Sequence, residues 1–293
     1  MKKKILIVGS TGYLGSVLYL YLSSKNYECI AHDVDYFKNT LLYKCQKFKK
    51  LKDNYKDVCY SDLRGFYAVI FLAGFSNDPF GDLNPSQFYK PTVKYTVKIA
   101  KLCKKLGVKF IFPSSCSVYG MANIKKKLRE QDVTNPVTYY SKNKIEIENE
   151  LKKISSKNFN PIMLRLATIF GLSPRMRFDI VINMLSGMAL VNNKITLNSN
   201  GLAWRPHLHI DDACQAFYHS LNWKPRKKEK YLILNVGDNR NNTTIIHIAK
   251  IIQKRLKKCK IEFQNKTNSI FVNKNISDGV DKRSYKINFN KLN

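Results

Sequence analysis

The sequence predicts an α/β fold, in which a doubly wound parallel sheet carries helices on both faces and a smaller α/β lobe follows. Two observations predict this fold. Short apolar runs alternate with segments of helical period through the first two thirds of the chain, which is typical of a parallel sheet. The first apolar run also ends in a glycine-rich turn that opens the first helical segment, as expected where a strand meets its crossover helix.

The individual elements follow from the spacing of apolar residues. Strands are predicted at the apolar runs Ile5–Val8, Cys29–His32, Val69–Leu72, Val108–Phe112 and Ile162–Leu166, with a further short strand near Val58. Helices are predicted where apolar residues recur every three or four positions. These stripes are formed by Leu14, Leu18, Tyr21 and Leu22, by Val93, Val97 and Ala100, and by Ile147, Leu151 and Ile154.

The pattern changes after Gly171 and indicates a second lobe. An apolar helix is predicted over Phe178–Leu190 and a short strand over Lys194–Leu197, and the remaining chain alternates less regularly. We therefore expect a first domain over residues 1–170, to which about 204–238 return. The smaller lobe, over 171–203 and 239–293, is expected to hold the substrate.

Composition excludes several classes of protein. The 293 residues are 44% hydrophobic, which is enough for a core and excludes a disordered chain. No apolar run approaches the roughly 20 residues of a membrane span. Seven scattered cysteines without a C-x-x-C pair or a zinc-like cluster predict reduced cytoplasmic thiols and no metal site.

The formal charge of +30 arises from 51 Lys+Arg against 21 Asp+Glu. Lysine supplies 41 of these cations and asparagine is also abundant, at 28 residues. Such a chain has few of the forked guanidinium groups that read bases. We interpret the charge as a compositional bias and expect neither nucleic acid nor a membrane as a partner.

The glycine-rich turn has the spacing of a dinucleotide-binding loop. Its G-x-x-G-x-x-G pattern follows the first strand directly, and the residues expected to surround the cofactor are Gly9, Thr11, Gly12, Tyr13, Leu14 and Gly15. Glycines allow the backbone to approach a pyrophosphate, and the free N–H groups at the helix N-terminus bind its oxygens.

Asp33 ends the second predicted strand, eighteen residues past Gly15. A carboxylate in this place accepts hydrogen bonds from the adenine ribose and repels a 2′-phosphate, so that NAD is predicted rather than NADP. The other residues expected to contact the cofactor follow the next strands and are Asp62, Leu63, Leu72, Ala73 and Gly74.

Three residues have the chemistry of a proton-transfer site. Ser115 closes the strand Val108–Phe112, at the sheet edge where ligands bind. Tyr140 and Lys144 are four residues apart and therefore share one helix face. A neighbouring ammonium lowers the pKa of a tyrosine towards the range of a general base. Tyr139 is a competitor by position, but residue 143 is Asn, so that only Tyr140 has a lysine partner.

The chain resembles the extended short-chain dehydrogenase/reductase family in four motifs that follow in the same order: the glycine loop, the strand-end acid, the S-x-x-V-Y-G segment Ser115–Gly120 and the Tyr-x-x-x-Lys pair. Within it the chain is similar to the NAD-dependent nucleotide-sugar epimerases and dehydratases, from Lys3 to about Leu292. This resemblance implies a Rossmann fold, tightly held NAD, a Ser–Tyr–Lys catalytic set and a homodimer. The dimer would form through helices of each subunit over about Thr92–Leu106 and Tyr140–Ser155.

The chain departs from the family pattern at several positions. The dehydratases of the family place an Asp-Glu pair after the catalytic Ser/Thr, where this chain has Cys116 and Ser117. We therefore do not expect 4,6-dehydration. Family asparagines are replaced by Pro91 or Lys90 at one position and by Thr168 at another, which leaves the sugar open.

A nucleotide-diphosphate sugar is the expected partner. Guanidinium groups pair bidentately with phosphate, and several of the ten arginines fall in or beside the motif segments. The candidate substrate-binding residues are Ser76, Asn77, Ser117, Thr168, Arg175, Arg177, Arg205 and Arg283. Arg165 is expected to be buried and structural, and Glu146 and Glu148 to be solvated; His207 and His209 are given no chemical role.

Three functions remain open from the sequence. The first, which we favour, is a nucleotide-sugar epimerase that acts through a transient 4-keto sugar, with Ser115, Tyr140 and Lys144 as catalytic residues. The second is a 4-dehydrogenase or ketoreductase that uses the same residues on a nucleotide-linked sugar or heptose. The third is a non-catalytic NAD-binding protein with affinity for polyanions, against which the intact Tyr140 and Lys144 argue.

Overall fold

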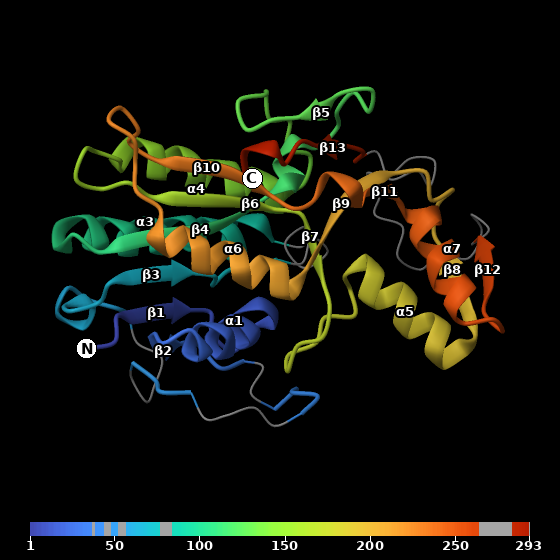
Figure 1. Ribbon diagram of the computed structural model, residues 1–293, viewed down its shortest axis with the longest axis horizontal. Coiled ribbons are helices and arrows are strands. Elements are labelled where there is room, and N and C mark those ends of the chain that lie inside the picture. Colours follow the sequence, from blue (N-terminus) through green and yellow to red (C-terminus); the bar gives the residue numbers. More distant parts are fainter. Residues whose placement is uncertain (37–38, 44–47, 52–56, 77–83, 264–282, 293) are drawn as a thin grey trace.

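The protein is built around a six-stranded parallel sheet (Figure 1). The computed structural model describes all residues except 37–38, 44–47, 52–56, 77–83, 264–282 and 293. The strands run in the order β10-β6-β4-β3-β1-β2, and all five neighbouring pairs are parallel. They are β1 (Lys4–Val8), β2 (Glu28–His32), β3 (Ala68–Phe71), β4 (Lys109–Ser115), β6 (Ile162–Leu166) and β10 (Leu232–Val236). The predicted doubly wound parallel sheet is confirmed.

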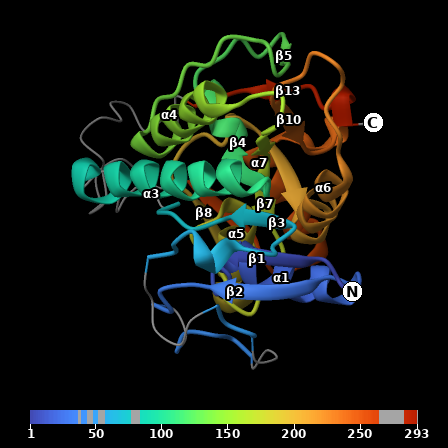
Figure 2. The same ribbon diagram turned by 90° about the vertical axis from the view of Figure 1, so that its left-hand side faces the viewer.

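Helices cover both faces of this sheet (Figures 1 and 2). On one face lie α1 (Tyr13–Ser24) and α6 (Ile210–Asn222), and on the other α3 (Pro85–Leu106) and α4 (Tyr139–Ile154). Side chains of β1 alternate between the two cores, because successive strand residues point to opposite faces. Ile5 packs with the α1 and α6 side, and Leu6 with the α3 and α4 side.

Two helices begin at other residues than the sequence predicted. The helix expected from Thr92 begins at Pro85, because the side chain of Asn84 caps it by accepting a hydrogen bond from the Gln87 N–H. The helix expected over Phe178–Leu190 is α5 (Val181–Asn192), which starts only after Ile180 has adopted an extended conformation. It ends at Asn193, whose φ of 50° is left-handed.

The strand predicted near Val58 is absent from the described part of the chain around that residue. The sheet edge beside β2 is extended instead by one parallel bridge between Ala31 and Lys50. The Ala31 N–H donates to the Lys49 carbonyl (2.7 Å), and the Leu51 N–H donates to the Ala31 carbonyl (2.8 Å). Val58 is fully buried beneath the sheet, so that its apolar character reflects packing rather than strand pairing.

Smaller sheets and two helices form the part of the molecule beyond the carboxyl ends of the main strands (Figure 1). One sheet joins β11 (Asn242–Thr244), β9 (Trp204–His209) and β7 (Thr168–Phe170), and the other joins β12 (Lys260–Phe263) to β8 (Lys194–Leu197). The predicted strand Lys194–Leu197 is thus confirmed. Residues of α5 and of α7 (Ile245–Arg255) pack with β8 in a core of their own.

The last described residues return to the main core. Strand β13 (Lys286–Ile287) pairs with β5 (Lys127–Leu128). Phe289 is 2% exposed and belongs to the core on the α1 and α6 face. Single 3₁₀ turns complete the elements, at η1 (Ser61–Leu63), η2 (Cys116–Tyr119), η3 (Asn239–Asn241) and η4 (Asn290–Leu292). The expected division into two lobes stays a prediction.

Candidate functional site

The glycine loop forms a tight cradle at the carboxyl end of β1. Gly9 has a φ of +89°, and a Cβ there would lie 2.6 Å from the Ala73 nitrogen. A Cβ on Gly15 would lie 2.0 Å from the Gly9 carbonyl oxygen. Neither position therefore accepts a side chain, and the loop folds directly into α1, whose N-terminal N–H groups have no side-chain cap.

The polar atoms of this cradle fit a bound dinucleotide. The hydroxyl oxygens of Ser10 and Thr11 are buried and have no hydrogen-bond partner among the described residues. Buried hydroxyls are normally satisfied, and phosphate oxygens at a helix N-terminus would satisfy these. Gly12, Tyr13 and Leu14 lie at the start of the helix, as predicted.

Asp33 lies at the end of β2 beside the loop. Its Oδ2 accepts a hydrogen bond from the Thr11 N–H (2.9 Å), and its Oδ1 accepts one from the Asp35 N–H (3.0 Å). The carboxylate is thus held against the cradle, where it would meet the adenine ribose. This placement agrees with the predicted preference for NAD.

We expect Asp33→Asn to weaken NAD binding about tenfold or more, because a hydrogen bond to a charged group contributes about 1.5–3 kcal/mol. Because the carboxylate charge is lost, the ratio of the affinity for NAD to the affinity for NADP should also decrease. Fluorescence titration with both nucleotides measures the two affinities. Asp35→Asn, two residues on, is the matched control and should keep the preference. An unchanged NAD to NADP ratio in Asp33→Asn would contradict the assignment.

The other predicted cofactor residues lie on neighbouring segments. The Leu72 N–H donates to the Val8 carbonyl (2.7 Å), which places the segment with Ala73 and Gly74 beside the glycine loop. Asp62 lies in η1, and its Oδ2 accepts hydrogen bonds from the N–H (2.8 Å) and the thiol (3.0 Å) of Cys59. Leu63 is fully buried. Contacts of these residues with the adenine remain predictions.

The structure brings the carboxyl end of β4 and the start of α4 to the same edge of the sheet. Ser115 is the last residue of β4, and its Oγ accepts a hydrogen bond from the Ser117 N–H (3.1 Å). Thr138 caps α4 by accepting from the Ser141 N–H (3.2 Å), so that Tyr140 falls in the first turn. The Ser117 hydroxyl is buried and has no partner among the described residues.

Lys144 lies one turn after Tyr140 and points to the sheet. Its Nζ donates to the Pro113 carbonyl (2.7 Å) and lies 5.4 Å from the centre of the Tyr140 ring. Burial lowers the pKa of Lys144 to about 7, and the carboxylate of Glu148 opposes this shift. The ammonium is therefore close enough to act on the tyrosine, as the spacing predicted.

The expectation that Glu148 is solvated is wrong. Glu146 is exposed, but Glu148 is fully buried and forms an ion pair with Arg165 (2.7 Å). The lysine-rich sequence of α4 suggests a solvated helix, but the face that carries Glu148 packs against the sheet. Arg165 itself is 2% exposed, which confirms its predicted buried, structural role.

Arg177 connects the two sides of the expected substrate site. Its Nη1 donates to the Ser76 hydroxyl (2.8 Å), and its Nη2 donates to the Asp179 carboxylate (2.6 Å). Burial lowers the pKa of its guanidinium, but the hydrogen-bonded Asp179 carboxylate and, less strongly, the nearby Tyr140 and Tyr13 raise it, so that the pKa lies above its ordinary value. Arg177 therefore lies beside both the predicted general base and the cofactor loop.

The remaining substrate candidates have different surroundings. Arg175 donates to the Met176 carbonyl (2.6 Å), and Thr168 lies on β7 opposite His207. Arg205 is buried, donates to the carbonyls of Trp204 and Arg283, and lies over the Tyr285 ring. Asn77 lies outside the described residues. Arg205 thus holds the chain near Arg283, and diphosphate binding by these arginines remains a prediction.

Two residues that fix the geometry of this region, Asn183 and Asp179, were not predicted from the sequence. The Asn183 amide donates to the Tyr13 hydroxyl (3.2 Å) and to the Arg177 carbonyl (2.9 Å). The Tyr13 hydroxyl in turn donates to the Gly171 carbonyl (2.7 Å). Asp179, two residues from Arg177, could have been suspected from its spacing. Asn183 could not, because Tyr13, whose hydroxyl it contacts, is 170 residues away in the sequence.

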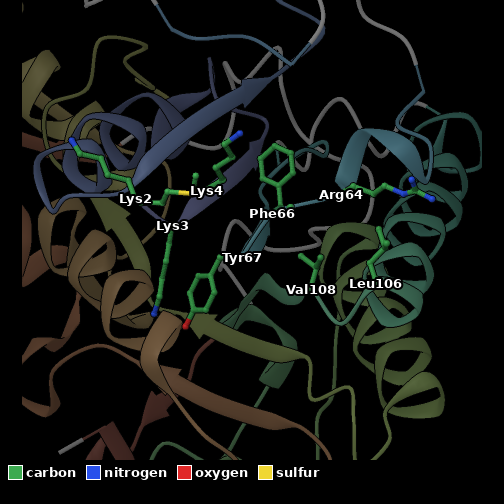
Figure 3. A pocket seen from close by; sticks show the side chains of 10 residues that line it. Lys2, Lys3, Lys4, Arg64, Phe66, Tyr67, Leu106 and Val108 are labelled. Carbon is green, nitrogen blue, oxygen red and sulfur yellow. The ribbon is translucent and has the colours of Figure 1, made fainter.

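A basic hollow lies at the opposite, amino-terminal edge of the strands. Figure 3 shows this hollow, which has a volume of ≈ 480 Å³ and is lined by Lys2, Lys3, Lys4, Arg64 and apolar residues such as Phe66. The Lys3 ammonium lies 4.3 Å from the centre of the Tyr67 ring. Part of the positive charge is therefore remote from the cofactor loop and from Tyr140.

The described residues lack two other features, a metal cluster and a membrane-spanning helix. No group of three or more His, Cys, Asp or Glu side chains there could hold a metal ion. Nor does any described helix combine the length and the apolarity that a membrane crossing requires.

The fold, the glycine loop and the Ser115, Tyr140 and Lys144 set together define the extended short-chain dehydrogenase/reductase class. A sequence profile of the NAD-dependent epimerase/dehydratase family matches residues 5–237. The chain therefore belongs to this NAD-dependent family.

Among curated proteins, the chain is similar to the bifunctional polymyxin resistance protein ArnA of Wigglesworthia glossinidia brevipalpis, at 26% identity over 85% of this chain and 41% of that protein. It is 28% identical to the dTDP-D-glucose 4,6-dehydratase of Dictyostelium discoideum, over 85% of this chain and 62% of that protein. It is 24% identical to the UDP-glucose 4-epimerase 2 of Arabidopsis thaliana, over 87% and 81%. The chain thus spans less than two thirds of the length of the first two relatives.

Solved structures share the fold. The UDP-N-acetylglucosamine 4-epimerase of Methanobrevibacter ruminantium M1 superposes with a TM-score of 0.80 at 20% identity, over 100% of this chain and 91% of that one. MoeE5 in complex with UDP-glucuronic acid and NAD superposes with a TM-score of 0.77 at 18% identity, over 98% and 90%. These identities establish the architecture alone.

Proposed function

We propose that this enzyme is a nucleotide-sugar 4-epimerase that works through a transient 4-keto sugar. One observation carries the proposal: Ser115 at the end of β4 and the pair Tyr140 and Lys144 on α4 lie at the same edge of the sheet as the glycine loop. A sugar held between them would have its C4 hydroxyl within reach of Tyr140. The curated and solved relatives that are named 4-epimerases agree with this reaction type.

Each of the three side chains has a distinct task. Tyr140 takes the proton from the C4 hydroxyl as general base and returns it after reduction. Lys144 stabilises the phenolate of Tyr140 and would bind the nicotinamide ribose, while Ser115 donates a hydrogen bond to the sugar oxygen. Bound NAD supplies the redox chemistry at C4, first as oxidant and then in its reduced form. Between oxidation and reduction the 4-keto sugar must rotate in the site, so that its opposite face is reduced.

Dehydration is disfavoured by the environment of Cys116. This thiol is 1% exposed and donates to the Arg165 carbonyl (3.2 Å). Burial raises the pKa of Cys116 far above its ordinary value, so that it offers neither an accessible acid nor a base. Ser117, at the second dehydratase position, carries no ionisable group at neutral pH.

Substrate binding is proposed to use the diphosphate. Arg177, Arg175, Arg205 and Arg283 are the candidate partners, with Ser76, Asn77, Ser117 and Thr168 facing the sugar. A homodimer through α3 and α4 is proposed as well, since these helices lie side by side on one face of the sheet (Figure 2).

The product and the redox state of the cofactor test the reaction. Purified protein is incubated with UDP- and GDP-sugars, among them UDP-glucose and UDP-glucuronic acid, and the products are separated by chromatography. The expected result is a C4 epimer formed without added NAD. Stoichiometric NADH with a keto product would instead support the alternative, a 4-dehydrogenase or ketoreductase.

A further inference from the structure

Glu148 lies one helical turn after Lys144, on the face of α4 that is turned to the sheet. Its side chain is fully buried. Its Oε1 accepts hydrogen bonds from Arg165 Nε (2.9 Å) and from the Ser114 hydroxyl (2.5 Å). Its Oε2 accepts a third hydrogen bond from Arg165 Nη2 (2.7 Å). One carboxylate therefore joins α4 to both β4 and β6.

These contacts link the elements that carry the proposed catalytic residues. Ser114 precedes Ser115 on β4 and lies in register with Arg165 on β6. Lys144 donates to the carbonyl of Pro113, the residue before Ser114. A shift of Glu148 would thus change the spacing between Ser115 and the helix that carries Tyr140.

Glu148 is the carboxylate whose charge acts on the ammonium of Lys144. The ionisable groups that face this region are Tyr140 and Glu148 on α4, Cys116 and Tyr119 on η2, Arg165 on β6, Glu130 after β5, Tyr89 on α3 and Arg177 across the site. Burial raises the pKa values of Cys116 and Tyr119, so that both are neutral at pH 7. The lysines of α3 are exposed.

Arg165 has its charge compensated locally. Besides Glu148, its Nη1 donates to the Tyr119 hydroxyl (2.8 Å) and to the Glu130 carbonyl (3.2 Å). The Tyr119 hydroxyl donates onward to Asn235 Oδ1 (2.8 Å). This network is satisfied at every step, as a buried ion pair requires. Glu148 is also the carboxylate that raises the pKa of Lys144 against the effect of burial.

We propose that Glu148 is a positioning residue, which holds the Tyr140 helix at its distance from Ser115 and favours the charged form of Lys144. The proposal rests on the proposed function for its consequence in turnover, but the protonation of Lys144 can be measured without it.

Two isosteric variants on the same helix test the charge effect. Glu148→Gln removes the buried carboxylate, and Glu146→Gln removes an exposed one, which solvent screens. Competitive labelling of the full-length protein with acetic anhydride from about pH 4 to about pH 10, followed by mass spectrometry, reports the titration midpoint of Lys144. In Glu148→Gln the titration midpoint of Lys144 should fall by about one pH unit relative to the wild type. In Glu146→Gln the midpoint should be the same as in the wild type. An unmoved midpoint in Glu148→Gln would overturn the proposal.

Turnover gives a second measurement on the NAD-loaded enzyme. A lower pKa means that the ammonium of Lys144 is lost at lower pH, so the alkaline limb of the kcat profile should move to lower pH in Glu148→Gln. A uniform drop in kcat at every pH would show a merely structural role. If the wild type converts no nucleotide sugar, the proposed function fails while the labelling result still decides the proposal.

A further variant covers the case in which Glu148→Gln does not fold, because Arg165 is left as an unpaired buried cation. Glu148→Gln with Arg165→Gln removes both charges and keeps similar volumes. The midpoint of Lys144 should lie below that of Arg165→Gln alone, because the loss of the Arg165 cation is common to both variants and only the double variant lacks the carboxylate that supports the ammonium. A midpoint equal to that of Arg165→Gln would overturn the proposal in this background as well.

Discussion

Tyr140→Phe should lower the rate of sugar conversion by about 10²-fold or more, which is typical for the loss of a general base. The phenyl ring keeps the packing over Lys144, whose ammonium lies 5.4 Å from the Tyr140 ring centre, so the protein should fold and retain NAD. Steady-state rates and the amount of nucleotide released on denaturation measure the two effects.

Tyr139→Phe is the matched control for this experiment. Tyr139 is the preceding residue on the same helix, is 47% exposed and lies near Lys142 rather than Lys144. Its loss should leave the rate unchanged. Wild-type turnover in Tyr140→Phe would remove this residue from the mechanism, and a large loss in Tyr139→Phe would mean that the helix face is assigned wrongly.

Gly15→Ala should destabilise the fold and abolish tight NAD binding. The added Cβ would lie 2.0 Å from the Gly9 carbonyl oxygen and 2.9 Å from the Ser10 Cα. Both are backbone atoms, so relief requires a movement of the loop or of α1. Overpacking of this kind costs about 1–3 kcal/mol, which unfolding by urea measures, and calorimetry with NAD measures the loss of affinity.

Gly12→Ala separates the two effects of the loop. At Gly12 the nearest atom to an added Cβ is the Gly9 oxygen at 3.4 Å, and φ is −76°. Because Gly is preferred to Ala at an N-cap, stability should fall by about 0.5–1 kcal/mol, while the Cβ would obstruct the approach of the pyrophosphate. A Gly15→Ala protein as stable as Gly12→Ala would contradict the steric argument.

The parts of the site that are local in sequence could be predicted. Gly9, Asp33 and the pair of Tyr140 and Lys144 are placed by short-range geometry: a turn, a strand end and one helical turn. The structure finds each in the expected element. The parallel sheet follows from similar local patterns, because buried strands are short apolar runs bounded by turns.

The parts of the site that depend on partners distant in sequence could not be predicted. Glu148 resembles a surface residue in a lysine-rich helix, and only the guanidinium of Arg165 and the Ser114 hydroxyl explain its burial. Val58 has the composition of a strand residue, yet the edge bridge forms at Lys50. The carbonyl contacts of Arg205 with Trp204 and Arg283 are equally invisible in a linear pattern.

The position of β10 in the sheet has a consequence for biosynthesis. Strand β6 gains its outer neighbour only from residues Leu232–Val236, and Phe289 fills the same core later still. A ribosome releases the amino-terminal segments first, so β1, β2, β3 and β4 can assemble while the outer edge of β6 is still exposed. Until β10 has emerged, nascent chains carry the unpaired edge of β6 and are prone to aggregate, which makes this interval the one in which a chaperone would protect them.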